Sequence, residues 1–159
     1  MRRAWPWFVL AAGIAVADQA VKALVQASLA PGQRISVLPF FDLVLVFNKG
    51  AAFSFLAGAP GWQTPAFLAV AGVAAAVISV MLVREPGKRL LASGLALILG
   101  GALGNAWDRA SLGHVVDFVL LHAWGWHFPA FNVADSAITV GAGLVIVDGF
   151  VHREARREG

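Results

Sequence analysis

Two aspartates in the C-terminal half of the chain, Asp117 and Asp135, are the residues best suited to chemistry. Two carboxylates within hydrogen-bonding distance do not both ionise easily, so they share one proton and divide into a base and an acid. The base takes a proton from a water molecule that attacks a peptide carbonyl, and the acid donates a proton to the carbonyl oxygen. The pair therefore predicts aspartyl protease chemistry, which needs no metal and no covalent intermediate.

The surrounding stretch, residues 100–136, concentrates polar side chains in an otherwise apolar chain. Its polar members are Asn105, Asp108, Arg109, Asp117, Asn132 and Asp135. Such residues are costly near a bilayer and usually persist there for function. Each aspartate also has a plainer interpretation: Asp117 as a solvated loop carboxylate, and Asp135 as a charge at a helix N-terminus that Asn132 caps. The gathering of polar residues favours the catalytic hypothesis over these alternatives.

The composition predicts a membrane protein. Of the 159 residues, 59% are hydrophobic and 13% are charged, and the mean hydropathy is +0.76, whereas a soluble domain has roughly 25% charged residues. We expect one integral-membrane domain over residues 1–159. The pI near 10.2 comes from short basic clusters that flank apolar runs, which is typical of membrane topology and not of nucleic-acid binding. The absence of cysteine excludes disulfides, thiolate zinc sites and a cysteine nucleophile.

Four apolar segments are long enough to cross a hydrocarbon core, which takes roughly 20 helical residues. They cover about residues 5–27, 62–83, 90–109 and 133–151. The first is too long for a cleavable signal peptide and carries charges, so we expect it to be retained. Basic residues precede the first segment, lie between the second and third, and follow the fourth: Arg2, Arg3, Arg84, Lys88, Arg89, Arg153, Arg156 and Arg157. The positive-inside rule then predicts that both termini are cytoplasmic.

The two outer loops, about residues 28–61 and 110–132, contain β-favouring runs bounded by turn residues. We predict an α-helical membrane protein with four transmembrane helices and a small extracytoplasmic β-sheet that both outer loops form. The sheet is expected to rest on the membrane with its apolar face down, and Trp124, Trp126 and Phe128 are expected to anchor it at the headgroup level.

Polar residues of several helices are predicted to meet at one depth. At about 1.5 Å per residue, Asp18, Asn105 and Arg109 reach the outer third of the bilayer, where Asp135 opens the fourth helix. Asn105 and Arg109 share a helix face. Arg109 either extends to the interface without further function, or hydrogen-bonds substrate backbone or lipid oxygens together with Asn105.

Other polar and small residues are expected to support the fold. Asp18 and Lys22 are spaced for an ion pair along one helix, which would make their burial tolerable. Asp108 points elsewhere on its helix, so we expect a structural role. Gly100 and Gly104 form a GxxxG pattern, which indicates close helix packing, or else a groove that admits a substrate helix.

Two other hydrolytic chemistries fit less well. There is no HExxH motif, and His122 and His127 lie in a Trp-rich loop, so no metal is expected. A serine protease is disfavoured because GxSxG is absent, and Ser54 near Lys49 is a weak nucleophile and base pairing.

Five motifs together resemble the lipoprotein signal peptidase (type II) family of bacterial inner membranes. They are DQAVK (18–22), FNKGAAFSF (47–55), GGALGNAWDR (100–109), GHVVDF (113–118) and FNVADS (131–136). They fall in the first, third and fourth apolar segments and in both outer loops, in the family's order. The resemblance implies a metal-independent aspartyl endopeptidase without a cofactor. Such an enzyme removes the signal peptide of a diacylglyceryl-modified prolipoprotein, just before the lipidated cysteine.

The resemblance also implies roles for individual residues. Asp117 and Asp135 look like the catalytic dyad, and Asp18 and Lys22 match a structural polar pair. The substrate-binding or site-supporting residues would be Asn48, Gly101, Asn105, Arg109, Asn132 and Ala134. The partners would be the lipid-modified prolipoprotein and membrane lipid, in the bacterial cytoplasmic membrane with the active site near the extracytoplasmic face. A monomer suffices for this chemistry.

Two non-enzymatic hypotheses make different predictions. A small transporter or proton-relay subunit would spread its polar residues along a path through the membrane. A membrane-interaction scaffold would tolerate replacement of both aspartates.

Overall fold

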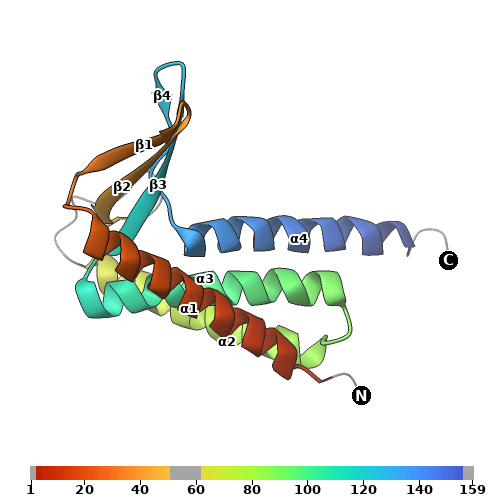
Figure 1. Cartoon of the computed structure of the whole chain (residues 1–159). Coiled ribbons are helices and arrows are strands. Elements are labelled where there is room, and N and C mark those ends of the chain that lie inside the picture. Colours follow the sequence, from red (N-terminus) through yellow and green to blue (C-terminus); the bar gives the residue numbers. More distant parts are fainter. Residues whose placement is uncertain (1–2, 51–61, 156–159) are drawn as a thin grey trace.

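The computed structural model describes residues 3–50 and 62–155, and only the backbone of 152–155. The helices are α1 (Trp5–Ser28), α2 (Gln63–Arg84), α3 (Arg89–Leu112) and α4 (Val133–Ala155), and the strands are β1 (Arg34–Leu38), β2 (Phe41–Asn48), β3 (Val115–Ala123) and β4 (Trp126–His127) (Figure 1). All four helices are long and apolar enough to span a membrane. The predicted fold class, four spanning helices with a small sheet from both outer loops, is confirmed.

Some sequence predictions fall outside the described residues. These are the end of the FNKGAAFSF motif after Gly50, the weak serine candidate Ser54, any strand in 51–61, and the basic residues Arg2, Arg156 and Arg157. The side chain of Arg153 is likewise not described.

Helix α3 is the centre of the bundle, because α1, α2 and α4 all pack against it. Small residues allow this approach. A Cβ atom on Gly100 would lie 2.5 Å from the backbone oxygen of Ala11 in α1, and one on Gly101 would lie 2.4 Å from that of Ala134 in α4. The GxxxG region is therefore used for close packing, the first of its two predicted uses.

Local chemistry sets where the helices begin and end. Pro6 lies in the first turn of α1, where its missing N–H costs no helical hydrogen bond. Helix α3 ends at Gly113, whose φ of 75° is the left-handed conformation that glycine adopts readily. The helix thus runs three residues past the predicted end at 109, which places Arg109 inside its last turn.

The sheet is antiparallel, with strand order β1-β2-β3-β4. Strand β2 comes from the first outer loop and β3 from the second, and their pairing joins the two loops. The β3–β4 hairpin turns at Trp124 and Gly125, both with positive φ, as a two-residue turn between twisted strands requires. Trp124 is fully exposed at this turn; the position of the sheet relative to the membrane stays a prediction.

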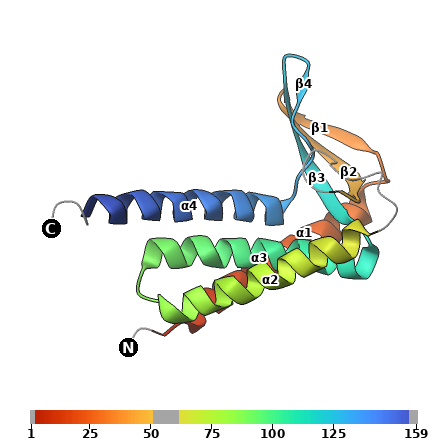
Figure 2. The same ribbon diagram turned by 180° about the vertical axis from the view of Figure 1, so that it is seen from behind.

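The main apolar core and most of the buried polar side chains lie toward opposite ends of the bundle. The start of α1, the turn between α2 and α3, and the end of α4 lie together at one end, and the sheet stands across the other (Figures 1 and 2). The main apolar core lies toward the first of these ends: Ala11, Ile78, Leu82, Ala92, Leu95 and Leu99. The buried polar side chains described below lie where α1, α3 and α4 meet the sheet.

Candidate active site

Asp117 projects from β3 and is almost completely buried, with 2% of its surface exposed. Both of its carboxylate oxygens accept hydrogen bonds from amide side chains. Asn48 of the neighbouring β2 donates to Oδ2 at 3.0 Å, and Asn132 donates to Oδ1 at 2.8 Å. The pairing of β2 with β3 thus holds one side of this carboxyl group, and the residue before α4 holds the other.

Asp135 lies in the first turn of α4. Its Oδ1 accepts a hydrogen bond from the side-chain amide of Asn105 at 2.8 Å, and its Oδ2 accepts one from the backbone N–H of Asn132 at 3.3 Å. Asn132 Oδ1 in turn accepts from the Asp135 N–H at 2.9 Å. This reciprocal arrangement is a capping box, so Asn132 both caps α4 and orients Asp135.

Asn132 is the residue that joins the two carboxylates. It is fully buried, its side chain donates to Asp117, and its backbone donates to Asp135. The same side-chain amide also lies 3.2 Å from the Asn105 side-chain oxygen and 3.2 Å from the Val116 carbonyl oxygen. The structure therefore brings the two predicted catalytic aspartates to one polar centre.

The environment of Asp117 favours its protonated form. Burial raises the pKa of this carboxyl group to about 7, and the nearby charge of Asp135 acts in the same direction. Hydrogen bonds from Asn48 and Asn132 and the positive charge of Lys22 oppose that increase in the Asp117 pKa. A carboxylic acid that keeps its proton near neutral pH is suited to act as a general acid.

A cavity of about 510 Å³ opens beside the carboxyl groups. Helices α3 and α4, strand β3 and the segment before α4 supply most of its wall: Asn48, Asn105, Arg109, Val115, Asp117, Leu121, Phe128, Pro129, Ala130, Phe131, Asp135, Ser136, Ile138, Thr139 and Val140. Most of the wall is apolar, and the polar atoms gather at the aspartates. This combination is usual for a ligand site, in which a few polar groups fix orientation.

Arg109 lies at the edge of this cavity. Its Nη2 donates to the carbonyl of Gly50 at 3.0 Å, and its guanidinium lies over the Phe67 ring, 4.8 Å from the centroid. Its Nε is buried and has no hydrogen-bond partner among the described residues. Arg109 thus ties α3 to the first outer loop and to α2.

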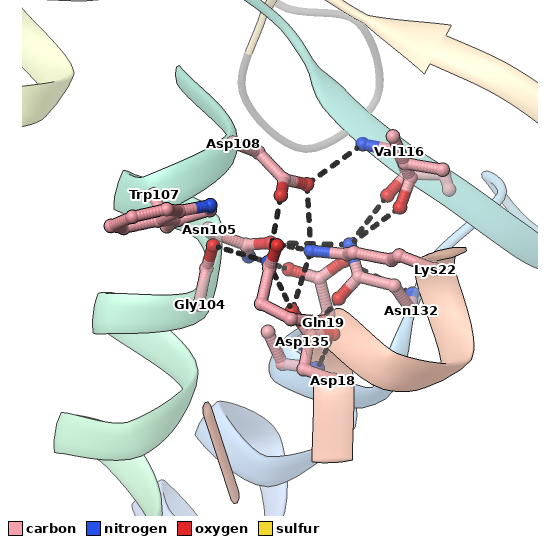
Figure 3. A network of polar contacts seen from close by, with 12 residues as sticks. Asp18, Gln19, Lys22, Gly104, Asn105, Trp107, Asp108, Val116, Asn132 and Asp135 are labelled. Atoms are coloured by element: carbon pink, nitrogen blue, oxygen red, sulfur yellow. Dashed lines mark hydrogen bonds and ion pairs between the residues drawn. The ribbon is translucent and has the colours of Figure 1, made fainter. Parts of the chain in front are cut away.

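A buried ion cluster adjoins the carboxyl pair. Lys22 Nζ lies 2.7 Å from Asp18 Oδ2 and 2.8 Å from Asp108 Oδ2, and all three side chains are almost completely inaccessible (Figure 3). The predicted ion pair of Asp18 and Lys22 is present. Asp108, expected to be structural, also accepts from the Val116 N–H at 3.1 Å, which fixes the start of β3 to α3.

Two further predicted residues contribute through their backbone. The N–H of Ala134 donates to Asp18 Oδ1 at 2.9 Å, so α1 holds the first turn of α4. Gly101 lies against the Ala134 carbonyl, as described above. The sequence analysis missed Gln19, whose side chain donates to Asp108 at 2.8 Å and to the Gly104 carbonyl at 3.2 Å. Gln19 could have been noticed in the sequence, because it is a polar amide directly after Asp18 inside a segment that is predicted to span the membrane.

Residues 10–151 of the chain match the family described as Signal peptidase (SPase) II. The chain belongs to the signal peptidase II family. The match covers the four spanning helices and the sheet, so the family resemblance of the sequence motifs is confirmed.

Similar proteins carry a name consistent with signal peptidase II. A lipoprotein signal peptidase of Paraburkholderia phytofirmans is 53% identical over 143 residues, which are 90% of this chain and 83% of the relative. A lipoprotein signal peptidase of Ectopseudomonas mendocina is 50% identical over 157 residues, 96% of this chain and 92% of the relative. A solved structure of a bacterial membrane enzyme, obtained by the in meso method at 2.3 Å resolution, superposes with a TM-score of 0.86 at 26% identity, over 97% of this chain and 93% of the other.

These likenesses support a multi-pass membrane protein of a peptidase family. A peptidase agrees with the reaction class expected from the carboxyl groups of the chain. The residue roles, the aspartyl mechanism and metal independence stay predictions. Among the described side chains of residues 3–50 and 62–151, no group of three or more His, Asp or Glu is arranged to hold a metal ion.

Proposed function

We propose that this protein is a membrane aspartyl endopeptidase that cleaves the signal peptide from diacylglyceryl-modified prolipoproteins, just before the lipidated cysteine. The observation that carries the proposal is the pair of carboxyl groups, Asp117 and Asp135, which Asn132 bridges at the wall of a largely apolar cavity. The name of the relatives supports the substrate class.

The environments of the two aspartates suggest different roles in catalysis. Asp135 accepts two hydrogen bonds at the N-terminus of α4, where the helix dipole favours negative charge. We therefore assign Asp135 as the base, and Asp117, whose pKa burial raises to about 7, as the acid.

The reaction proceeds in two proton-balanced steps. Asp135 removes a proton from water as the water oxygen bonds to the scissile carbonyl carbon, and Asp117 gives its proton to the carbonyl oxygen. The tetrahedral intermediate then collapses: its C–N bond breaks, the proton on Asp135 passes to the leaving nitrogen, and a hydroxyl proton of the intermediate returns to Asp117. The original protonation states are restored.

Substrate recognition follows from the cavity wall and its polar rim. The apolar side chains of α4 and of the segment before it suit a signal-peptide helix and acyl chains that stay in the bilayer. Arg109 and Asn105 line the cavity beside the carboxyl groups and would hydrogen-bond the substrate backbone or lipid ester oxygens. Binding energy from these remote parts positions the scissile bond.

The enzyme is proposed to work in the bacterial cytoplasmic membrane as a monomer, with both termini in the cytoplasm and the site near the extracytoplasmic face. Arg84, Lys88 and Arg89 are exposed in and beside the turn between α2 and α3, at the end of the bundle opposite the sheet. This placement supports that orientation by the positive-inside rule.

The non-enzymatic alternatives are not favoured. A transporter or relay would need polar groups along a path, whereas Asp18, Lys22, Asn105 and Asp108 form one contiguous polar network with Asp135 (Figure 3).

The test is cleavage of a diacylglyceryl-modified prolipoprotein by wild type, Asp117→Asn and Asp135→Asn, followed by gel shift, with a chelator added in parallel. Each asparagine keeps the shape of the side chain but cannot exchange the proton, so both variants are expected to be inactive and the chelator to have no effect. Wild-type activity in either variant would refute the dyad, and inhibition by the chelator would refute the metal-free mechanism.

A further inference from the structure

Lys22 is a buried cation that the reaction above does not use. Its ammonium group has three hydrogens and no acceptor, and three side-chain oxygens surround it. These are Asp18 Oδ2 at 2.7 Å, Asp108 Oδ2 at 2.8 Å and Asn105 Oδ1 at 3.0 Å. The first two contacts balance its charge, and the third joins the ion cluster to the carboxyl pair.

The contact with Asn105 determines which end of that amide faces the carboxyl pair. Lys22 and Asn132 both donate to Asn105 Oδ1, so the amide nitrogen is left to donate to Asp135 Oδ1 at 2.8 Å. The opposite orientation would place an amide N–H₂ against an ammonium group and an amide oxygen against a carboxylate. Both contacts would be repulsive.

Asn132 alone is a weak substitute for Lys22 in this role. Its side-chain amide nitrogen lies near three acceptors, Asn105 Oδ1, Asp117 Oδ1 and the Val116 carbonyl, and it has only two hydrogens for them. Lys22 is the charged donor, and Asp18 and Asp108 hold it from α1 and α3 (Figure 3).

We propose that Lys22 is a positioning residue for the reaction: it orients the Asn105 amide so that this amide donates to Asp135 and holds the proposed base in place. This inference rests on the proposed function. It assigns Lys22 a role in the rate of the chemical step, beyond the support of the fold that the sequence predicted for the pair of Asp18 and Lys22.

Two variants and one control test this role. Lys22→Met keeps the bulk of the side chain and removes the donor. It also leaves two carboxylates without a cation and can impair folding, so the neutral triple variant Asp18→Asn/Lys22→Met/Asp108→Asn accompanies it. Replacing a whole buried ion cluster is often close to neutral for stability, and the new asparagine oxygens can still accept from the Ala134 and Val116 N–H groups. Lys88→Met, at an exposed lysine paired with Glu85, is the matched control.

The measurements are kcat and KM for prolipoprotein cleavage, expressed per folded molecule, with the folded fraction taken from thermal unfolding in detergent. We expect kcat to fall by about 10²-fold in both Lys22 variants, since misplacing a reacting group by about 1 Å can cost that much. KM is expected to change less than kcat, because Lys22 does not line the cavity and reaches the substrate only through Asn105. Lys88→Met is expected to be unchanged.

The pH profile measures a second effect of Lys22, the effect of its charge on Asp117. The charge of Lys22 opposes the increase in the Asp117 pKa, so its loss in Lys22→Met should raise that pKa further. The decline of cleavage on the alkaline side should then move to higher pH.

Several results would overturn the proposal. A kcat per folded molecule within about threefold of wild type in the neutral triple variant, a difference of under about 1 kcal/mol, would show that Lys22 only supports the fold. Activity that falls only in proportion to the folded fraction would show the same. Because Asp117→Asn and Asp135→Asn test the dyad separately, active asparagine variants would instead refute the proposed function.

Discussion

Replacing Gly101 with alanine tests whether the packing of α3 on α4 sets the geometry of the active site. The added Cβ would lie 2.4 Å from the Ala134 backbone oxygen and 2.8 Å from Ile138 Cγ1, whereas ordinary contact begins at 3.4 Å. The obstacle is backbone, so a rotamer change cannot relieve it. The helices must separate by about 1 Å, the difference between 3.4 and 2.4 Å.

The cost to stability should be smaller than the cost to activity. Overpacking a close contact costs about 1–3 kcal/mol, and the better helix propensity of alanine returns about 1 kcal/mol. Movement of the first turn of α4 would also carry Asp135 away from the Asn105 amide, now at 2.8 Å. A 1 Å misplacement of a reacting group can reduce the rate by about 10²-fold.

The assay is the rate of prolipoprotein cleavage by Gly101→Ala, together with its thermal unfolding in detergent. Gly143→Ala is the matched control, because it lies on α4 and a Cβ there meets nothing within 4 Å. The control should keep its rate and gain slightly in stability. A Gly101→Ala variant with wild-type cleavage would refute the link between this contact and the site.

Three further predictions follow from individual contacts. Burial raises the Asp117 pKa to about 7, and the proposed acid acts only while it is protonated. Cleavage should therefore be fastest below that pH and decline as the pH rises through it. A rate that stays constant from about pH 6 to about pH 9 would contradict this assignment. Arg109→Ala should reduce kcat/KM by roughly 10- to 100-fold, as expected for loss of a charge-assisted hydrogen bond worth about 1.5–3 kcal/mol. Arg84→Ala, at an exposed arginine, is the control. An equal kcat/KM in the two variants would show that Arg109 only extends to the interface. Trp7→Phe removes the hydrogen bond from Trp7 Nε1 to the Pro86 carbonyl, 3.2 Å long. The variant should lower the free energy of unfolding by about 0.5–1.5 kcal/mol without changing kcat. A lower kcat at unchanged stability would contradict a purely structural role of Trp7.

The spanning helices could be predicted because a bilayer requires only length and apolarity. Partners across helices could not be predicted in this way. Lys22 was expected to pair with Asp18 at the favourable helical spacing, and it does. Its second carboxylate, Asp108, lies on another helix and becomes a neighbour because α3 approaches α1 closely along its glycine face. A Cβ on Gly104 would lie 2.7 Å from Asp18 Oδ2.

In the sheet, too, the strands could be predicted from the sequence, but the partners of a buried polar residue could not. The apolar run of the first outer loop predicted strands, and β1 and β2 formed. The role of Asp42 was missed, because the run was assessed for its apolar residues. Asp42 is completely buried, accepts from Ser36 Oγ at 2.6 Å, and forms an ion pair with Arg34; His122 Nε2 lies 3.0 Å from its Oδ2. The hydrogen bond from Ser36 is the main reason that the Asp42 pKa lies below its usual value.

The carboxyl pair draws one member from each part of the fold, and this division suits the proposed substrate. Asp117 lies on β3, outside the spanning helices, whereas Asp135 lies within the α4 segment that can span the membrane. Beyond Asp135, the cavity wall continues along α4 through Ile138 and Val140, which would face hydrocarbon in a bilayer. Under the proposed function, an apolar signal peptide would therefore approach along α4 without leaving the lipid. A soluble protease with the same two carboxyl groups would first have to extract its substrate from the bilayer. The position of the carboxyl pair at the membrane is therefore part of the proposed mechanism.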